Sequence, residues 1–315
     1  MILQGQINRV LAAEIDFFDL EYRLSPLPPD RQDQPLEESI GRVGLLCPPI
    51  LRKRGDIHQP LSGHHRAWVA SHRCALSALP CLVLPFDHDD RAALALALEA
   101  LSWKRTPSPM ELASFCRKML HHAEAKDIAE RFFPRLGLTP TPFLVEQYAR
   151  LTQLEEPFAV ALHQGRLQEG VARELLSFSL PERLVLFELI EGLHLSAGNQ
   201  RKLVESCREL GRRDKISPLR LLGGQDFQEI IKHPEMNVPQ KSAGLMRRFS
   251  ELRQPQLLDA TNEFAEFKRS LALPDNWQLT PTPSFEDERV TLSITLKDRE
   301  SLRRSLPLLL AAAAE

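Results

Sequence analysis

The sequence predicts an α/β domain at the N-terminus, an all-helical middle domain and a small α+β unit at the C-terminus. Short apolar runs broken by Pro and Gly precede residue 87, helical periodicity follows, and an alternating run returns at Val290–Leu296. We therefore divide the chain into residues 1–100 (α/β), 101–222 (helical), 223–260 (connector) and 261–315 (α+β).

The N-terminal elements follow from their local patterns. Residues 13–26 alternate apolar and polar side chains, which predicts a strand. Residues 36–43 place apolar side chains on one helical face, with Gly44 suited to end that helix. Two strands separated by a Gly-Asp turn follow over residues 50–61. Gly63 then opens a helix, and the run LPCLVLPF predicts a buried strand.

The middle of the chain has the spacing of a helix-turn-helix. Asp127–Leu136 and Thr141–Leu151 are two short amphipathic segments, and Gly137 and Pro140 interrupt them. The C-terminal unit predicts homodimer formation through its exposed strand and an amphipathic Leu302–Leu310 helix.

Composition restricts the compartment and the cofactors. The 315 residues include no apolar run of the roughly 18 residues that a membrane span needs, so we expect a cytoplasmic protein without membrane contact. The five cysteines form no C-x-x-C pair, which argues against a disulfide framework or a zinc site. His72, Cys74, His121 and His122 do not share one helix face, so no metal site is expected.

One continuous segment resembles a known family. LEESIGRVGLLCPPILRKRGDIHQPLSGHHRAWVASH is similar in order and spacing to the opening of the ParB-type partition proteins. Gly63, His64, His65 and Arg66 stand on the family's Gly-Glu-Arg-Arg motif. LALEALSWKRTPSPME resembles the family's Glu-Asn-x-x-Arg segment with its Asn-Pro-x-Glu ending. The resemblance covers about residues 13–215.

The resemblance implies a pocket for CTP with magnesium. In the family the glycine lets the backbone approach the phosphates closely, and arginines neutralise their charge. A gap-free match places Ala100 and Leu101 on the Glu-Asn pair and Lys104 on the arginine. A shift of one residue places Glu99 on the glutamate of that pair. The implied nucleotide-binding residues are therefore Gly63, His64, His65, Arg66, Glu99 and Lys104.

Two departures from the family motif weaken the expected chemistry. His64 and His65 replace a glutamate and an arginine, so triphosphate affinity should fall or depend on pH. No amide replaces the missing asparagine, so we expect weak or absent CTP hydrolysis. An ordinary tight turn into a helix with exposed polar side chains is the alternative interpretation of residues 63–66.

DNA contact is predicted from two regions, because a net charge of -2 gives no global attraction to nucleic acid. Candidate base contacts are Thr139, Thr141, Gln147 and Arg150, and the candidate phosphate contacts are Arg201, Lys202, Arg208, Arg212 and Arg213. The alternative for the first region is a helical bundle that does not recognise DNA sequence, and the alternative for the second is a basic helix face exposed to solvent.

These patterns predict a ParB-like DNA-binding protein that acts in chromosome or plasmid partition or in transcriptional regulation. The alternative is a non-enzymatic interaction or scaffold protein that keeps the architecture and binds a partner protein. Nuclease activity would need metal held by carboxylates, whereas Asp87, Asp89 and Asp90 are expected to cap a helix.

Overall fold

The structure is a computed structural model that describes residues 6–85, 89–271, 273–274, 276–282, 289–303 and 306. It divides into two compact units, Met1–Val204 and Glu205–Glu315, and each is described by itself. The predicted fold class is confirmed, with a small mixed sheet followed by helices and a two-stranded sheet near the C-terminus. Asp87, one of the carboxylates weighed for a nuclease, lies outside the described residues.

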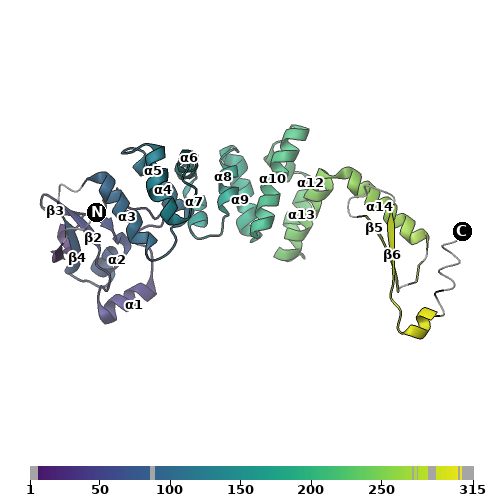
Figure 1. Cartoon of the computed structure of the whole chain (residues 1–315), viewed down its shortest axis with the longest axis horizontal. Helices are drawn as coiled ribbons and strands as arrows, with labels where there is room; N and C mark the ends of the chain where they lie inside the picture. The colour runs from purple at the N-terminus through teal and green to yellow at the C-terminus, as the bar shows by residue number, and fades with distance from the viewer. Residues whose placement is uncertain are drawn as a thin grey trace. The chain divides into compact units, whose positions relative to one another are not determined.

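The first unit begins with a four-stranded sheet and its three helices (Figure 1). Its elements are β1 (Gln6–Leu11), α1 (Gln34–Val43), β2 (Ile50–Arg54), β3 (Ile57–Ser62), α2 (His64–Trp68), β4 (Ala78–Leu84) and α3 (Asp90–Ser102). A π-helical turn, Val69–Arg73, continues α2.

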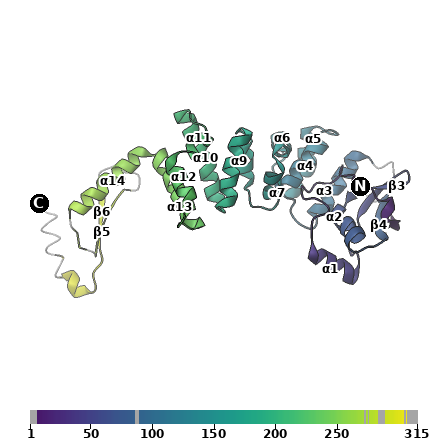
Figure 2. The same ribbon diagram turned by 180° about the vertical axis from the view of Figure 1, so that it is seen from behind.

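The sheet has the strand order β1-β4-β2-β3, in which β2 and β4 run parallel and the other neighbours run antiparallel. Figure 2 shows the sheet and its helices from behind. Apolar residues from the strands and from α1 and α2 form one buried core: Val10, Ile15, Ile40, Leu51, Ala67, Val69, Ala70, Leu79 and Cys81.

The strand predicted over residues 13–26 is wrong, because this segment is a series of turns after β1. Asp16 Oδ1 accepts hydrogen bonds from the backbone N–H groups of Phe18 and Asp19, and Asp19 Oδ1 accepts one from Glu21. Asp side chains that bond nearby backbone groups favour turns over strands. Ile15 retains one isolated bridge, to His58 of β3.

A buried cation ties this turn segment to the sheet. Arg52 is only 6% exposed, and its guanidinium donates to Gln59 Oε1 at 2.6 Å, to Tyr22 Oη at 2.8 Å and to Asp90 Oδ1 at 2.8 Å. Gln59 donates in turn to Asp19 Oδ2 at 2.6 Å. The network therefore joins the 19–22 segment, both strands of the β2–β3 hairpin and the start of α3.

The rest of the first unit is helical. Its helices are α4 (Pro109–Met119), α5 (Ala125–Phe132), α6 (Pro142–Arg150), α7 (Glu156–His163), α8 (Glu169–Leu175), α9 (Leu180–Gly192) and the first part of α10 (Ala197–Asp214). α6 packs on α4 and α5, and α7 packs on α4. The Phe115 and Phe132 rings meet edge to face at 5.0 Å within this core.

The second unit contains the end of α10 and further helices, followed by a two-stranded antiparallel sheet. The elements are α11 (Pro218–Leu222), α12 (Gln225–Lys232), α13 (Val238–Arg253), α14 (Pro255–Ser270), β5 (Trp277–Pro281) and β6 (Val290–Ile294). The predicted connector, residues 223–260, thus contains regular helices, and the predicted domain boundaries stay predictions. Most of the predicted Leu302–Leu310 helix lies outside the described residues.

Replacing Arg52 by Met should lower the free energy of unfolding by about 2 kcal/mol, because Gln59 and Asp90 lose a charged donor in a buried setting. Arg54→Met is the matched control. Arg54 is two residues along the same strand with a side chain 52% exposed, and its loss should cost less than about 0.5 kcal/mol. Urea titration measures both variants, and equal losses would contradict the network's role.

Candidate functional site

The turn between β3 and α2 requires glycine. Gly63 has a φ of +86°, in the left-handed region that other residues rarely adopt. A Cβ at this position would lie 3.1 Å from Pro49 Cα and 3.0 Å from Arg66 Nη2. The backbone conformation and the crowding both exclude a side chain, so the Arg66 guanidinium lies directly against the turn.

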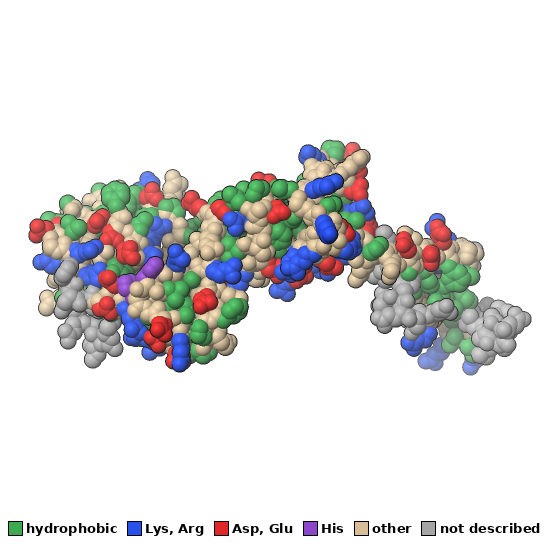
Figure 3. Space-filling view, turned by 90° about the horizontal axis from the view of Figure 1, so that it is seen from above, with side chains coloured by type: hydrophobic (Ala, Val, Ile, Leu, Met, Phe, Trp, Pro, Cys, Tyr) green, Lys and Arg blue, Asp and Glu red, His purple; other side chains and the backbone are tan. Residues whose placement is uncertain are grey.

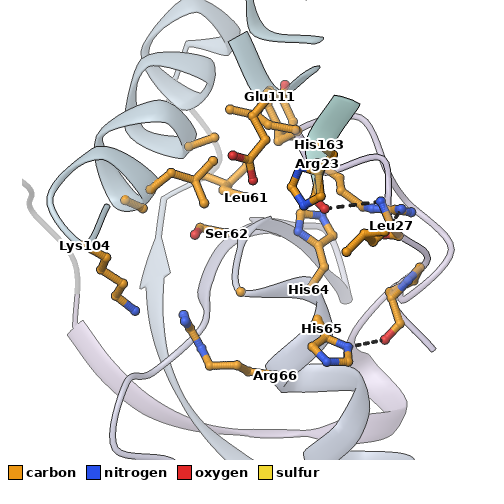
Figure 4. A pocket seen from close by; sticks show the side chains of 18 of the residues that line it. Arg23, Leu27, Leu61, Ser62, His64, His65, Arg66, Lys104, Glu111 and His163 are labelled. Atoms are coloured by element: carbon orange, nitrogen blue, oxygen red, sulfur yellow. Dashed lines mark hydrogen bonds between the residues drawn. The ribbon is translucent and has the colours of Figure 1, made fainter. Parts of the chain in front are cut away.

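A pocket opens at this turn, within the first unit (Figure 4). Four parts of the chain line it: the segment from Tyr22 to Arg31, the β3–α2 turn, the C-terminal end of α3 with the start of α4, and the last residue of α7. The polar lining residues are Tyr22, Arg23, Ser25, Arg31, Ser62, His64, His65, Arg66, Lys104, Arg105, Glu111 and His163.

The pocket holds an excess of positive charge. Among the described residues, no carboxylate forms an ion pair with Arg23, Arg31, Arg66 or Lys104. Burial lowers the pKa of Arg66, and its buried Nε atom has no hydrogen-bond partner among the described residues. Burial, followed by the charge of Arg31, lowers the pKa of Arg23. Asp30 and Asp33 act on Arg23 and Arg31 only from beyond ion-pair distance, so the four cations around this cavity attract an anion.

The two adjacent histidines have different surroundings. His64 is buried, and burial together with the charges of Arg23 and Lys118 lowers its pKa to about 4, so it is neutral at pH 7. His65 Nδ1 lies 2.7 Å from the Pro29 carbonyl oxygen, and its Nε2 lies 3.0 Å from Asp33 Oδ2. His65 therefore fixes the proline-rich segment beside the pocket.

A second polar cluster forms the helical wall of the pocket. Glu111 is fully buried and accepts two hydrogen bonds from Arg105, at 2.6 and 2.7 Å, and one from the Ser108 backbone at 2.8 Å. Burial raises the pKa of Glu111, but these hydrogen bonds outweigh it and the pKa lies below its usual value. Ser108 Oγ lies 2.8 Å from His163 Nδ1, which links α4 to α7.

Lys118 holds the segment that leads into the pocket. Its Nζ on α4 donates to the backbone carbonyls of Leu20 at 3.1 Å, Glu21 at 2.5 Å and Arg23 at 2.9 Å. An ammonium group has three protons, so all of its donors are used. Lys118 and Arg52 thus position the backbone that carries Arg23.

Most of the predicted nucleotide-binding residues lie together. Gly63, His64, His65, Arg66 and Lys104 all line this pocket. Glu99 does not line it, because its exposed carboxylate pairs with Arg135 at 2.9 Å.

Sequence reasoning missed several lining residues, namely Arg23, Arg31, Arg105, Glu111 and His163. For Glu111 a signal existed, because Ser108 and Glu111 have the spacing of a capping box. The other four are isolated charged or imidazole side chains, and no local pattern connects them to residues 63–66.

The predicted base-contacting residues lie around α5, α6 and the turn between them. Thr139 and Arg150 are exposed and Thr141 is half-buried at the N-cap of α6. The Gln147 side-chain oxygen accepts a hydrogen bond from Arg173 of α8, so its position is fixed. Phe143, 67% exposed, adds an apolar side chain at the start of α6.

The predicted phosphate-contacting residues all belong to α10. Arg201 and Lys202 are exposed on its first half. Arg208, Arg212 and Arg213 lie on the second half and line a shallow hollow with Arg253 of α13. Figure 3 shows Lys and Arg side chains gathered over the part of the chain that holds α10 to α13. Glu209 pairs with Arg253 at 2.6 Å, which neutralises part of this charge.

Two kinds of feature are absent from the described residues. No helix there has the length and apolar character needed to cross a membrane. No three His, Cys, Asp or Glu side chains gather there as a metal ion would require.

Comparison with known proteins points to one group of relatives. No family model matches the chain. It is 31% identical over 180 residues to the "Probable chromosome 1-partitioning protein ParB" of Deinococcus radiodurans, a match that covers 57% of this chain and 59% of the relative. It is 29% identical over 231 residues to the chromosome-partitioning protein Spo0J of Thermus thermophilus, covering 68% of this chain and 80% of the relative.

The chain thus spans less than two thirds of the Deinococcus relative. Among solved structures, it is similar to the C-terminally truncated chromosome-partitioning protein ParB from Caulobacter crescentus complexed with CTP-gamma-S. That match has 21% identity, covers 59% of this chain and 99% of the other, and has a TM-score of 0.24. The description of the fold therefore rests on the present structure alone.

Gly63→Ala should lower the free energy of unfolding by about 2 to 3 kcal/mol, because the new methyl group meets Pro49 and Arg66 in a strained backbone conformation. Gly55→Ala is the control: Gly55 has a φ of +64° with nothing within 4 Å, so only the cost of the conformation, about 1 kcal/mol, should appear. Thermal unfolding measures both, and equal losses would show that the crowding has no consequence.

Proposed function

We propose that the chain is a ParB-like, DNA-binding protein of the chromosome-partitioning type with a nucleotide pocket at Gly63–Arg66, and its similarity to the chromosome-partitioning proteins of Deinococcus radiodurans and Thermus thermophilus supports this. The observation that carries the pocket's role is a group of four cations that have no carboxylate within ion-pair distance among the described residues: Arg23, Arg31, Arg66 and Lys104. A nucleoside triphosphate would neutralise these charges and supply an acceptor for the buried Nε of Arg66.

The ligand that we propose is CTP. The residues present fit its phosphates, because Gly63 admits a close approach and the cations surround the turn. They offer little to magnesium, since the one carboxylate of the pocket, Glu111, is occupied by Arg105 and Ser108. Magnesium would therefore be held by phosphate oxygens and water.

For DNA, we propose that the α5–α6 pair acts as a helix-turn-helix and that α10 contacts phosphates. Thr139, Thr141, Gln147 and Arg150 would face bases, and Arg201, Lys202, Arg208, Arg212 and Arg213 would face the backbone. Exposed Arg and Lys side chains along one helix support the second assignment, because such contacts need charge and no fixed geometry.

A second copy of the chain is the protein partner that we propose, through the C-terminal unit. A two-stranded sheet such as β5–β6 is marginally stable alone. Val290, Leu292 and Phe267 are each at least 42% exposed on β6 and α14, so apolar surface is available for such a contact.

Calorimetric titration with CTP and magnesium should show binding that Arg66→Ala weakens about tenfold or more, because the alanine removes a charged phosphate donor. Arg73→Ala is the control, since Arg73 continues the same helix and does not line the pocket. ATP and GTP test base selectivity. No binding of any nucleotide would refute the pocket's role and favour a scaffold that keeps only the architecture.

DNA retention should depend steeply on salt. Replacing Arg201 and Lys202 together by Ala should make the slope of log affinity against log salt shallower by about 2, since each phosphate contact releases about one counter-ion. Arg42→Ala, an exposed change on α1, should leave the slope unchanged. Fluorescence anisotropy measures all three proteins, and equal slopes would show that α10 does not contact phosphates.

A further inference from the structure

One buried side-chain nitrogen of the pocket, on His64, has no hydrogen-bond partner in the part of the chain that the structure describes. His64 is 8% exposed, and its buried Nε2 has no hydrogen-bond partner among the described residues. Buried polar atoms in folded proteins nearly always have a partner, because leaving one unpaired costs free energy. Since His64 lines the pocket, the missing partner can be supplied by a ligand.

The protonation of the ring decides what kind of partner fits. His64 is neutral at pH 7, because burial and the nearby charges of Arg23 and Lys118 disfavour the imidazolium. A neutral imidazole carries one N–H. The Pro60 backbone acts to raise the pKa of His64, as a carbonyl facing a ring N–H does, and because Nε2 has no partner among the described residues we assign the proton to Nδ1. Nε2 therefore presents a lone pair and acts as an acceptor.

An acceptor at this position does not suit a phosphate oxygen, which is itself an acceptor. Figure 4 shows the ends of Arg66 and Lys104 on one side of the pocket and His64 with His163 and Arg23 on the other. His163 Nδ1 is already engaged by Ser108 Oγ, and burial lowers its pKa, so this side holds two neutral imidazoles. The pocket thus has one side formed by Arg66 and Lys104, which suits phosphate, and a second side where His64 and His163 offer uncharged polar atoms next to Arg23.

We propose that His64 makes the pocket selective for an organic phosphate over an inorganic one, by accepting a hydrogen bond from a hydroxyl or amino group of the ligand's non-phosphate part. This inference rests on the proposed nucleotide function of the pocket and assigns its second side. Ribose hydroxyls and the exocyclic amine of a nucleobase are donors of this kind. Inorganic tripolyphosphate has the charge of the triphosphate and offers no such donor.

Titrations of the full chain with magnesium and either CTP or inorganic tripolyphosphate test this assignment. The wild-type protein should prefer CTP. His64→Leu should weaken CTP binding about tenfold and change tripolyphosphate binding less than about twofold, because only the CTP contact uses Nε2. His64→Gln, which restores an oxygen acceptor, should recover CTP binding to within about threefold of the wild type.

The outcomes separate the inference from the function on which it rests. Equal weakening of both ligands in His64→Leu would overturn the role of His64 and leave the pocket as an anion site. Failure of the wild type to bind either ligand would overturn the proposed pocket and this inference together. If thermal unfolding shows that the Leu variant does not fold, the Gln variant decides: loss of the wild-type preference for CTP in that folded protein would overturn the assignment.

Discussion

Arg52 is a guanidinium in the interior of the sheet domain, and an ion in that position is stable only with nearly all its donors paired. Tyr22, Gln59 and Asp90, which accept its hydrogen bonds, come from three separate parts of the chain, so pairing it also fixes the turn segment around Tyr22 against the hairpin and α3. Lys118 acts on the same segment from α4, through three backbone carbonyls. The wall of the pocket that carries Arg23 depends on these two cations.

The basic side chains of the first unit therefore fall into two groups. Arg52, Lys118 and Arg105 have their donors directed at oxygens of the protein, and they hold segments together. Arg66 and Arg31 line the pocket without a carboxylate within ion-pair distance among the described residues. The second group is the one available to a ligand. A count of basic residues along the sequence does not separate the two groups, because the separation depends on which oxygens the fold brings near.

Local patterns were enough to predict the β2–β3 hairpin, the helix that ends at Gly44 and the turn at Gly63. They failed over residues 13–26, where the alternation of apolar and polar residues is produced by Asp-centred turns and not by a strand. Local patterns also predicted only part of the pocket, because its residues come from distant parts of the chain. Residues 63–66 are contiguous and carry a motif, whereas His163 joins them from 97 residues further along the chain (163 minus 66) through a contact with Ser108 that only the fold provides.

We propose that one ligand occupies a pocket built from distant parts of the chain. Hydrogen–deuterium exchange of the full chain, with and without CTP and magnesium, tests it directly. If one ligand contacts all these parts, CTP addition should slow exchange in three segments at once: residues 22–31, the β3–α2 turn and the end of α7 at His163. Exchange that is unchanged in all three, or that slows only in helices remote from the pocket, would contradict it.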